Sequence, residues 1–173
     1  LLCFSLASTT YSQNEVWRNT VTFYSNILHF EKNAARAYDN LGIYYMNHGQ
    51  YDQAIDALSH GIATSDVHAG ARYNLATTYL FKAFPMQSYA LNTTSNAMNA
   101  PYNFTVPRTL TREEKNNIMM AVENLKRSIE IQPEYFRSYQ TLGDIFEFLL
   151  KDKASADFYH SRALEILEKQ NYR

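Results

Sequence analysis

The side chains that most often carry chemistry are sparse in this sequence, and their spacing favours binding over catalysis. The five histidines are His29, His48, His60, His68 and His160. None of them pairs with another at the i, i+4 spacing of helical metal ligands. The pair His60 and His68 also lacks a carboxylate or cysteine at a spacing that would complete a metal site. We therefore expect turn or surface histidines and no metal site.

Sequence motifs for catalysis are missing as well. The chain contains no glycine-rich phosphate loop and no nucleophile elbow. Glu113, Glu114 and Glu130 are expected to cap a helix or to face solvent rather than to form an acid/base pair. The sequence therefore predicts a protein that is not an enzyme and has no cofactor.

Side-chain amides offer a different chemistry, because an asparagine can both donate and accept hydrogen bonds. Asn40 and Asn74 stand 34 residues apart, and each directly precedes a leucine and a small residue. This spacing belongs to a longer pattern. The pattern runs Asn40-Leu41-Gly42, Asn74-Leu75-Ala76 and Thr141-Leu142-Gly143, with an aromatic residue three positions after each. A period of 34 residues is typical of a helix-turn-helix unit that must stack on copies of itself to bury its apolar face.

The period divides the chain into four units within one domain, residues 1–173. The units are expected at 1–34, 35–68, 69–135 and 136–169, and the third is interrupted by an insertion at 83–112. Small residues in unit two, such as Gly42 and Gly61, should let its helices approach closely. The second helix of unit three is displaced, and Thr111 to Glu114 are typical of its capped start. One extra residue is expected in the turn of unit four.

Charge and composition exclude some partners. The chain has 16 Lys and Arg against 17 Asp and Glu, a net charge of −1, and no basic block, so nucleic acid is not an expected partner. Its 14 Tyr and 10 Phe are expected to act as large wedges between helices. The single cysteine, Cys3, excludes an internal disulfide.

Over almost its whole length the sequence resembles the tetratricopeptide repeat superfamily. Units two, three and four best match its pattern of an aromatic residue, Leu-Gly, Tyr, and then Ala, a large apolar residue, a small residue and Pro. The resemblance implies an all-α, right-handed solenoid of about four helix-turn-helix repeats. It also implies a non-catalytic protein–protein interaction scaffold, whose first helices line a concave groove for a peptide or a partner subunit.

The same resemblance implies which residues would line that groove. Asn40 and Asn74 occupy the position whose amide can bind a peptide backbone, and Thr141 interrupts this ladder in unit four. The alternative is that both amides merely bond the neighbouring helix. Further groove residues are expected at Asp39, Ile43, Tyr73, Thr77 and Gln140. We do not expect the carboxylate clamp of chaperone-binding members, because Asp144 and Glu147 would repel a carboxylate.

The N-terminal part has a narrower resemblance, to the C-terminal repeat domain of polytopic O-mannosyltransferase-like membrane proteins. It is carried by an apolar start at 1–7, by Tyr11 to Arg18, and by Ala34 to Gly42. It implies membrane attachment N-terminal to Leu1 and an extracytoplasmic location, periplasmic or luminal. A spanning helix needs about 20 apolar residues, so residues 1–7 could also end a signal peptide or belong to a repeat helix. Two alternative functions follow: a substrate-recruiting or assembly domain of a membrane-bound glycosyltransferase, and a structural subunit of a larger complex.

The insertion at 83–112 is rich in Asn, Thr, Ser and Ala and contains Pro85, Pro101 and Pro107. Its prolines predict extended or turned backbone, and the segment is expected to contact either a partner or the repeats themselves. It also carries two glycosylation patterns, at Asn92 and Asn103.

Overall fold

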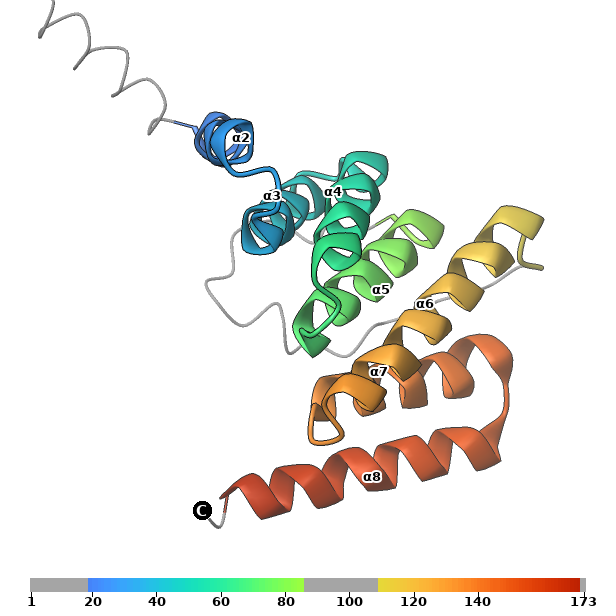
Figure 1. Cartoon of the computed structure of the whole chain (residues 1–173). Coiled ribbons are helices and arrows are strands. Elements are labelled where there is room, and N and C mark those ends of the chain that lie inside the picture. The colour runs from blue at the N-terminus through green and yellow to red at the C-terminus, as the bar shows by residue number, and fades with distance from the viewer. Residues whose placement is uncertain (1–18, 86–108, 172–173) are drawn as a thin grey trace, which may run out of the picture. The chain divides into compact units, whose positions relative to one another are not determined.

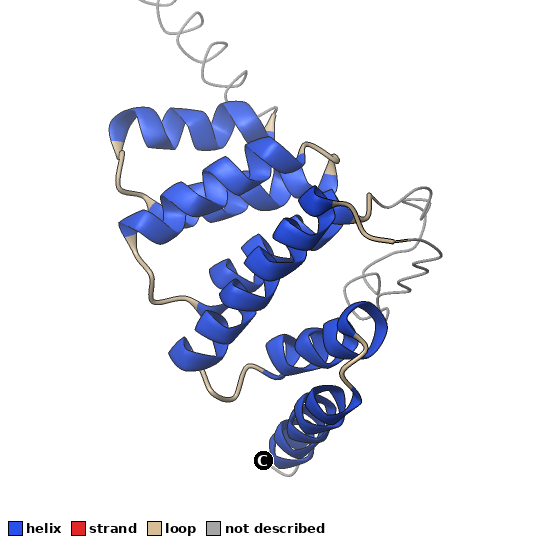
Figure 2. Ribbon diagram, turned by 90° about the vertical axis from the view of Figure 1, so that its right-hand side faces the viewer, coloured by secondary structure: helices blue, strands red, loops and turns tan. Residues whose placement is uncertain are grey.

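A computed structural model describes residues 19–85 and 109–171, and within these ranges every regular element is helical (Figure 2). The expected all-α class is therefore confirmed. The N-terminal apolar stretch, most of the insertion, and both glycosylation patterns lie outside the described residues. The chain divides into two compact units, residues 1–66 and 67–173, and each is described by itself below.

The first unit contains α2 (Thr20–Phe30), α3 (Ala35–Asn47) and α4 (Tyr51–Thr64) (Figure 1). Asn19 caps α2, because its side chain accepts a hydrogen bond from the Val21 amide at 2.8 Å. Helices α3 and α4 form the expected hairpin of unit two. Between them Gly49 has a φ of +71°, a conformation that glycine adopts without steric cost.

A small residue sets the distance between α3 and α4. A Cβ atom placed on Gly42 would lie 2.5 Å from Leu58 Cγ and 3.3 Å from the Ala54 carbonyl oxygen. Leu58 and Ala54 are fully buried. The leucine therefore packs directly on the glycine backbone, which brings the two helices together along their apolar faces.

The second unit contains α5 (Ala69–Ala83), α6 (Arg112–Ile131), α7 (Phe136–Asp144), the π-helical segment η2 (Ile145–Leu150) and α8 (Lys153–Asn171). Helices α5 and α6 pack against each other although an insertion separates them in the sequence, and α6 begins at the capped start that the sequence indicates. Thr111 begins α6 with a capping box. Its hydroxyl accepts from the Glu114 amide, and the Glu114 carboxylate accepts from the Thr111 amide at 2.7 Å.

The core of this unit joins α5, α6, α7 and η2. Its fully or nearly fully buried members are Ala76, Leu80, Ile118, Ala121, Leu125, Leu142 and Ile145. Buried hydroxyls tie the same helices together: Ser128 donates to the Ala69 carbonyl at 2.9 Å, and Ser138 donates to Ser128 at 2.8 Å. On the partly buried side, Arg72 of α5 donates to the Asn124 side chain of α6 at 2.9 Å.

The extra residue of unit four lies in a helix rather than in the turn where it was expected. From Ile145 to Leu150 the backbone is π-helical, and a π-helical turn holds one residue more than an α-helical turn. The segment ends at Lys151, which has a φ of 57°. Gly42 meets Leu58, 16 positions later, whereas Gly143 meets His160, 17 positions later. The π-helical segment thus accounts for the one additional residue between the two contacting positions of unit four.

We predict that Gly42→Ala destabilises the first unit by about 1–3 kcal/mol, because the new methyl group overpacks the contact with Leu58. Urea unfolding followed by circular dichroism measures the effect. Gly70→Ala is the matched control, since a Cβ there meets only the Tyr135 hydroxyl at 3.8 Å. Equal stability of Gly42→Ala and wild type would contradict the proposed packing.

Candidate functional site

The expected groove residues of the first unit, Asp39, Asn40 and Ile43, all lie on α3 and are partly exposed. Asp39 leans toward the hairpin partner: its Oδ1 atom would lie 2.8 Å from a Cβ on Gly61 of α4. The small residue at Gly61 therefore makes room for this carboxylate.

In the second unit, Tyr73, Asn74 and Thr77 lie on α5, and Gln140 lies on α7. Gln140 is exposed, and Tyr73 and Asn74 are partly exposed. Tyr73 packs against the core and meets the Tyr135 ring edge to face, with 5.6 Å between centroids. Thr77 is only 5% exposed, so a partner could reach little of its side chain.

Asn40 and Asn74 belong to different compact units. The two-rung ladder that would join them remains a prediction, and so does the groove as a whole. Among the expected groove residues, the accessible ones are Asp39, Asn40 and Ile43 in the first unit and Tyr73, Asn74 and Gln140 in the second.

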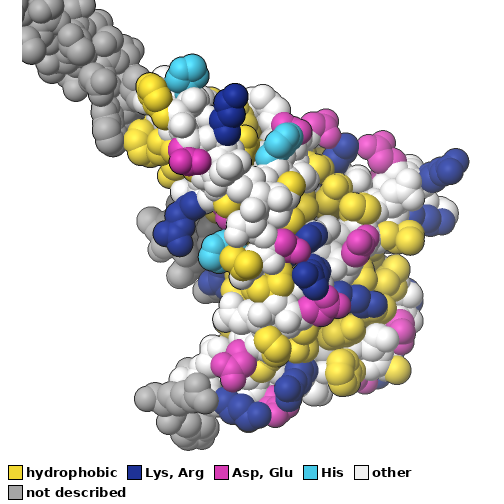
Figure 3. Space-filling view, viewed as in Figure 1, with side chains coloured by type: hydrophobic (Ala, Val, Ile, Leu, Met, Phe, Trp, Pro, Cys, Tyr) yellow, Lys and Arg dark blue, Asp and Glu magenta, His cyan; other side chains and the backbone are white. Residues whose placement is uncertain are grey.

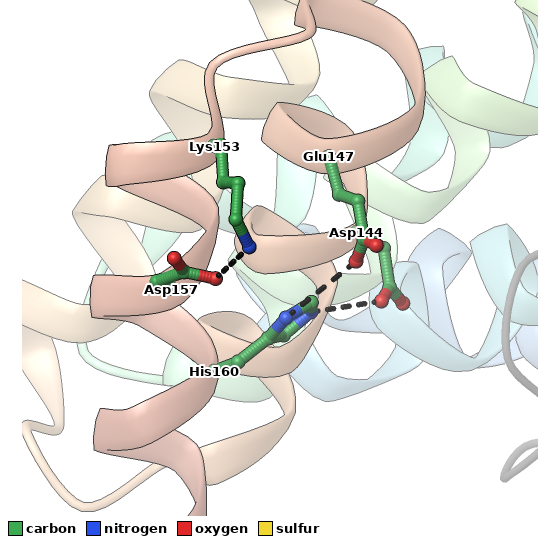
Figure 4. Close-up of polar contacts among 5 residues, drawn as sticks. All are labelled: Asp144, Glu147, Lys153, Asp157 and His160. Atoms are coloured by element: carbon green, nitrogen blue, oxygen red, sulfur yellow. Dashed lines mark hydrogen bonds and ion pairs between the residues drawn. The ribbon is translucent and has the colours of Figure 1, made fainter.

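One polar cluster joins α7, η2 and α8 and was missed from the sequence. His160 of α8 hydrogen-bonds Asp144 Oδ1 through Nε2 at 3.1 Å, and its Nδ1 lies 3.7 Å from Glu147 Oε2 (Figure 4). Earlier on α8, Lys153 and Asp157 form an ion pair at 3.1 Å. His160 was expected to be a turn or surface histidine, but its side chain is only 32% exposed.

Gly143 creates the space for the His160 ring. A Cβ on this glycine would overlap the imidazole, so the ring packs directly on the backbone of α7. The spacing of residues in the repeats could have predicted this contact from the sequence. Counting forward from Gly143, with one residue added for the longer unit, leads to His160.

Burial dominates the electrostatics of Asp144, whose side chain is 10% exposed. Desolvation raises the pKa of the Asp144 carboxyl, and the charge of Glu147 also raises it, whereas the hydrogen bond and charge of His160 lower it. The net direction is upward. The described parts of the chain hold no group of three His, Cys, Asp or Glu side chains arranged to bind a metal ion.

The paired helices, with a small residue at each crossing, define a helical repeat protein. No family model matches the sequence, and no curated protein does. Solved structures do resemble it. One of them, the MamA RS-1 ArsTM double mutant, is 15% identical, with a TM-score of 0.62 over 94% of this chain and 72% of that one. Another, MamA MSR-1 C2, is 13% identical, with a TM-score of 0.58 over 92% of this chain and 72% of that one.

At these identities the likeness establishes the fold alone. It agrees with the expected all-α helical repeat fold. Membership of the tetratricopeptide repeat superfamily remains a prediction. None of the comparisons bears on the O-mannosyltransferase resemblance, which remains a prediction.

We predict that Asp144→Asn removes part of the pH dependence of stability. The raised pKa means that the folded protein holds this proton more tightly than the unfolded chain. The contribution is fully present below the unfolded pKa, 3.8, and is lost as pH rises through the folded pKa. The free energy of unfolding of the variant, relative to wild type, should therefore increase as pH rises from 3.5 to 7. Urea titrations across this range measure it, and a difference independent of pH would refute the assignment.

Proposed function

We propose that this protein is a non-catalytic scaffold for protein–protein interaction, which binds a peptide or a partner subunit through the first helices of its repeats. The observation that carries the proposal is the exposure of amide and aromatic side chains on these helices: Asn40, Tyr73, Asn74 and Gln140. On the second helices α4 and α6, Leu58 and Leu125 are completely buried and serve packing.

The chemistry of these side chains suits a peptide. An amide can bond both the N–H and the C=O of an extended backbone, and a tyrosine ring offers an apolar face with a polar tip. Neither group selects strongly for one side-chain sequence. Figure 3 supports the same expectation, because the visible face mixes Lys and Arg with Asp and Glu and shows no large block of one charge. A sequence-tolerant interaction with a weak dependence on salt follows.

The two alternative functions, a recruiting domain of a membrane-bound glycosyltransferase and a structural subunit of a larger complex, gain no specific support from the comparisons. Among the described helices, none is both long and apolar enough to span a bilayer. The extracytoplasmic location and the membrane attachment remain predictions of the narrower resemblance.

We predict that peptides selected from a random display library on the immobilised protein bind through these amides. The Asn40→Ala/Asn74→Ala variant should bind them roughly tenfold more weakly, because each lost hydrogen bond costs about 0.5–1.5 kcal/mol. Gln140→Ala should also weaken binding. Fluorescence anisotropy with a labelled peptide measures the dissociation constants.

Lys126→Ala is the control, because Lys126 is exposed on α6, a second helix of its hairpin. It should bind like wild type. Unchanged affinity in the double variant would remove the two asparagines from the site. A library that yields no binding peptide would contradict the proposed function itself.

A further inference from the structure

The His160 ring occupies a place that leucine takes in the other hairpins. Leu58 packs on Gly42, and Leu125 lies in the same buried cluster as Ala76. Packing alone therefore does not require a histidine in the fourth unit. A polar ring beside two carboxylates adds a property that leucine cannot supply, namely the ability to take up a proton near neutral pH.

The two nitrogens of the His160 ring face different carboxylates, and protonation of the ring changes only the contact of Nδ1. A carboxylate only accepts hydrogen bonds, so the contact with Asp144 requires a hydrogen on Nε2. In the neutral ring Nδ1 then carries a lone pair, which faces the Glu147 carboxylate at 3.7 Å. In the imidazolium Nδ1 carries a hydrogen instead. Protonation therefore turns this contact from repulsive to attractive.

The charged groups around the ring come from every element that contacts it. Helix α8 packs against α7 and η2. Helix α7 contributes Asp144, η2 contributes Glu147, and α8 itself contributes Lys153 and Asp157, which neutralise each other as an ion pair (Figure 4). The surroundings of the ring are thus acidic on the side of α7 and η2.

We propose that Asp144, Glu147 and His160 form a proton-dependent clasp that holds η2 against α8. With a protonated ring, α8 is bound to the end of α7 and to the π-helical segment at the same time. With a neutral ring, the attraction between the ring and Glu147 is lost, so η2 is held less tightly against α8, although Phe146 still stacks on Tyr159. The clasp therefore tightens when the ring takes up a proton.

The burial of Asp144 acts in the same direction, because its raised pKa also favours the protonated folded state. The experiment must therefore separate the two groups. Glu147→Gln does so, since it removes the second carboxylate and leaves Asp144 in place. Glu147 is half exposed, so this substitution should not prevent folding.

Hydrogen exchange measured by mass spectrometry at pH 5.5 and pH 8 tests the clasp. After correction for intrinsic exchange, the amides of residues 147–152 should be about threefold less protected at pH 8 in wild type, the size expected for a partly exposed ion pair. These include the Asp152 amide, which donates to the Phe146 carbonyl at the end of η2. Glu147→Gln and His160→Gln should abolish this difference in protection between pH 5.5 and pH 8, which is called the step below.

His60→Gln is the matched control. His60 is also paired with a carboxylate, Asp56, at 3.5 Å, but the pair is exposed and lies on α4 in the first unit. This variant should keep the wild-type step in residues 147–152. The proposal is overturned if wild type shows no step, or if the step persists in Glu147→Gln, which would assign it to Asp144.

Discussion

The fold depends on one steric constraint, the close approach of two helices at a residue without a large side chain. Gly42 and Gly143 each accept a ring or branched side chain from the following helix directly on the backbone. Their contacts set the spacing at which the remaining apolar side chains interlock. Because interiors are packed as densely as organic crystals, a shift of one methyl group at these crossings would be felt along the whole hairpin. The hairpins in turn bury their remaining apolar surface by stacking, as the shared core of α5, α6, α7 and η2 shows.

Contacts between its two helices explain how unit three tolerates a long insertion. The entropic cost of closing a loop grows only slowly with its length, so the two ends can be brought together if enough contacts hold them. Here Ser128 and Asn124 supply polar contacts to α5, and the capping box at Thr111 restarts the helix. The buried hydroxyl pair of Ser128 and Ser138 also carries the contact on to α7. Polar groups at these sites are satisfied, so their burial costs little.

Sequence reasoning predicted the elements whose signals are local or periodic. The hairpin at 35–68 follows from its regular spacing, and α6 follows from its own small-residue pattern and from the capping signal at Thr111. The π-helical segment at Ile145–Leu150 was not predicted, because a repeat period counts residues and contains no information on which carbonyl each amide bonds. The burial of Thr77 was missed for a related reason, since exposure depends on which neighbours cover a position. The accessible amides are therefore known by position, while their binding role rests on the resemblance.

The pairing of His160 with Asp144 shows how a repeat can change its chemistry without changing its fold. A carboxylate with a side chain only 10% exposed is costly alone, and so is a polar ring in a position built for leucine. The two side chains hydrogen-bond each other, and Gly143 provides the room for the His160 ring. Neither residue can be understood as a single substitution in the repeat pattern, because removing His160 would leave the carboxylate of Asp144 largely buried without this hydrogen bond. The cluster therefore has to be treated as one unit, and its charge state is decided jointly by burial, by the second carboxylate of Glu147 and by the proton on the ring.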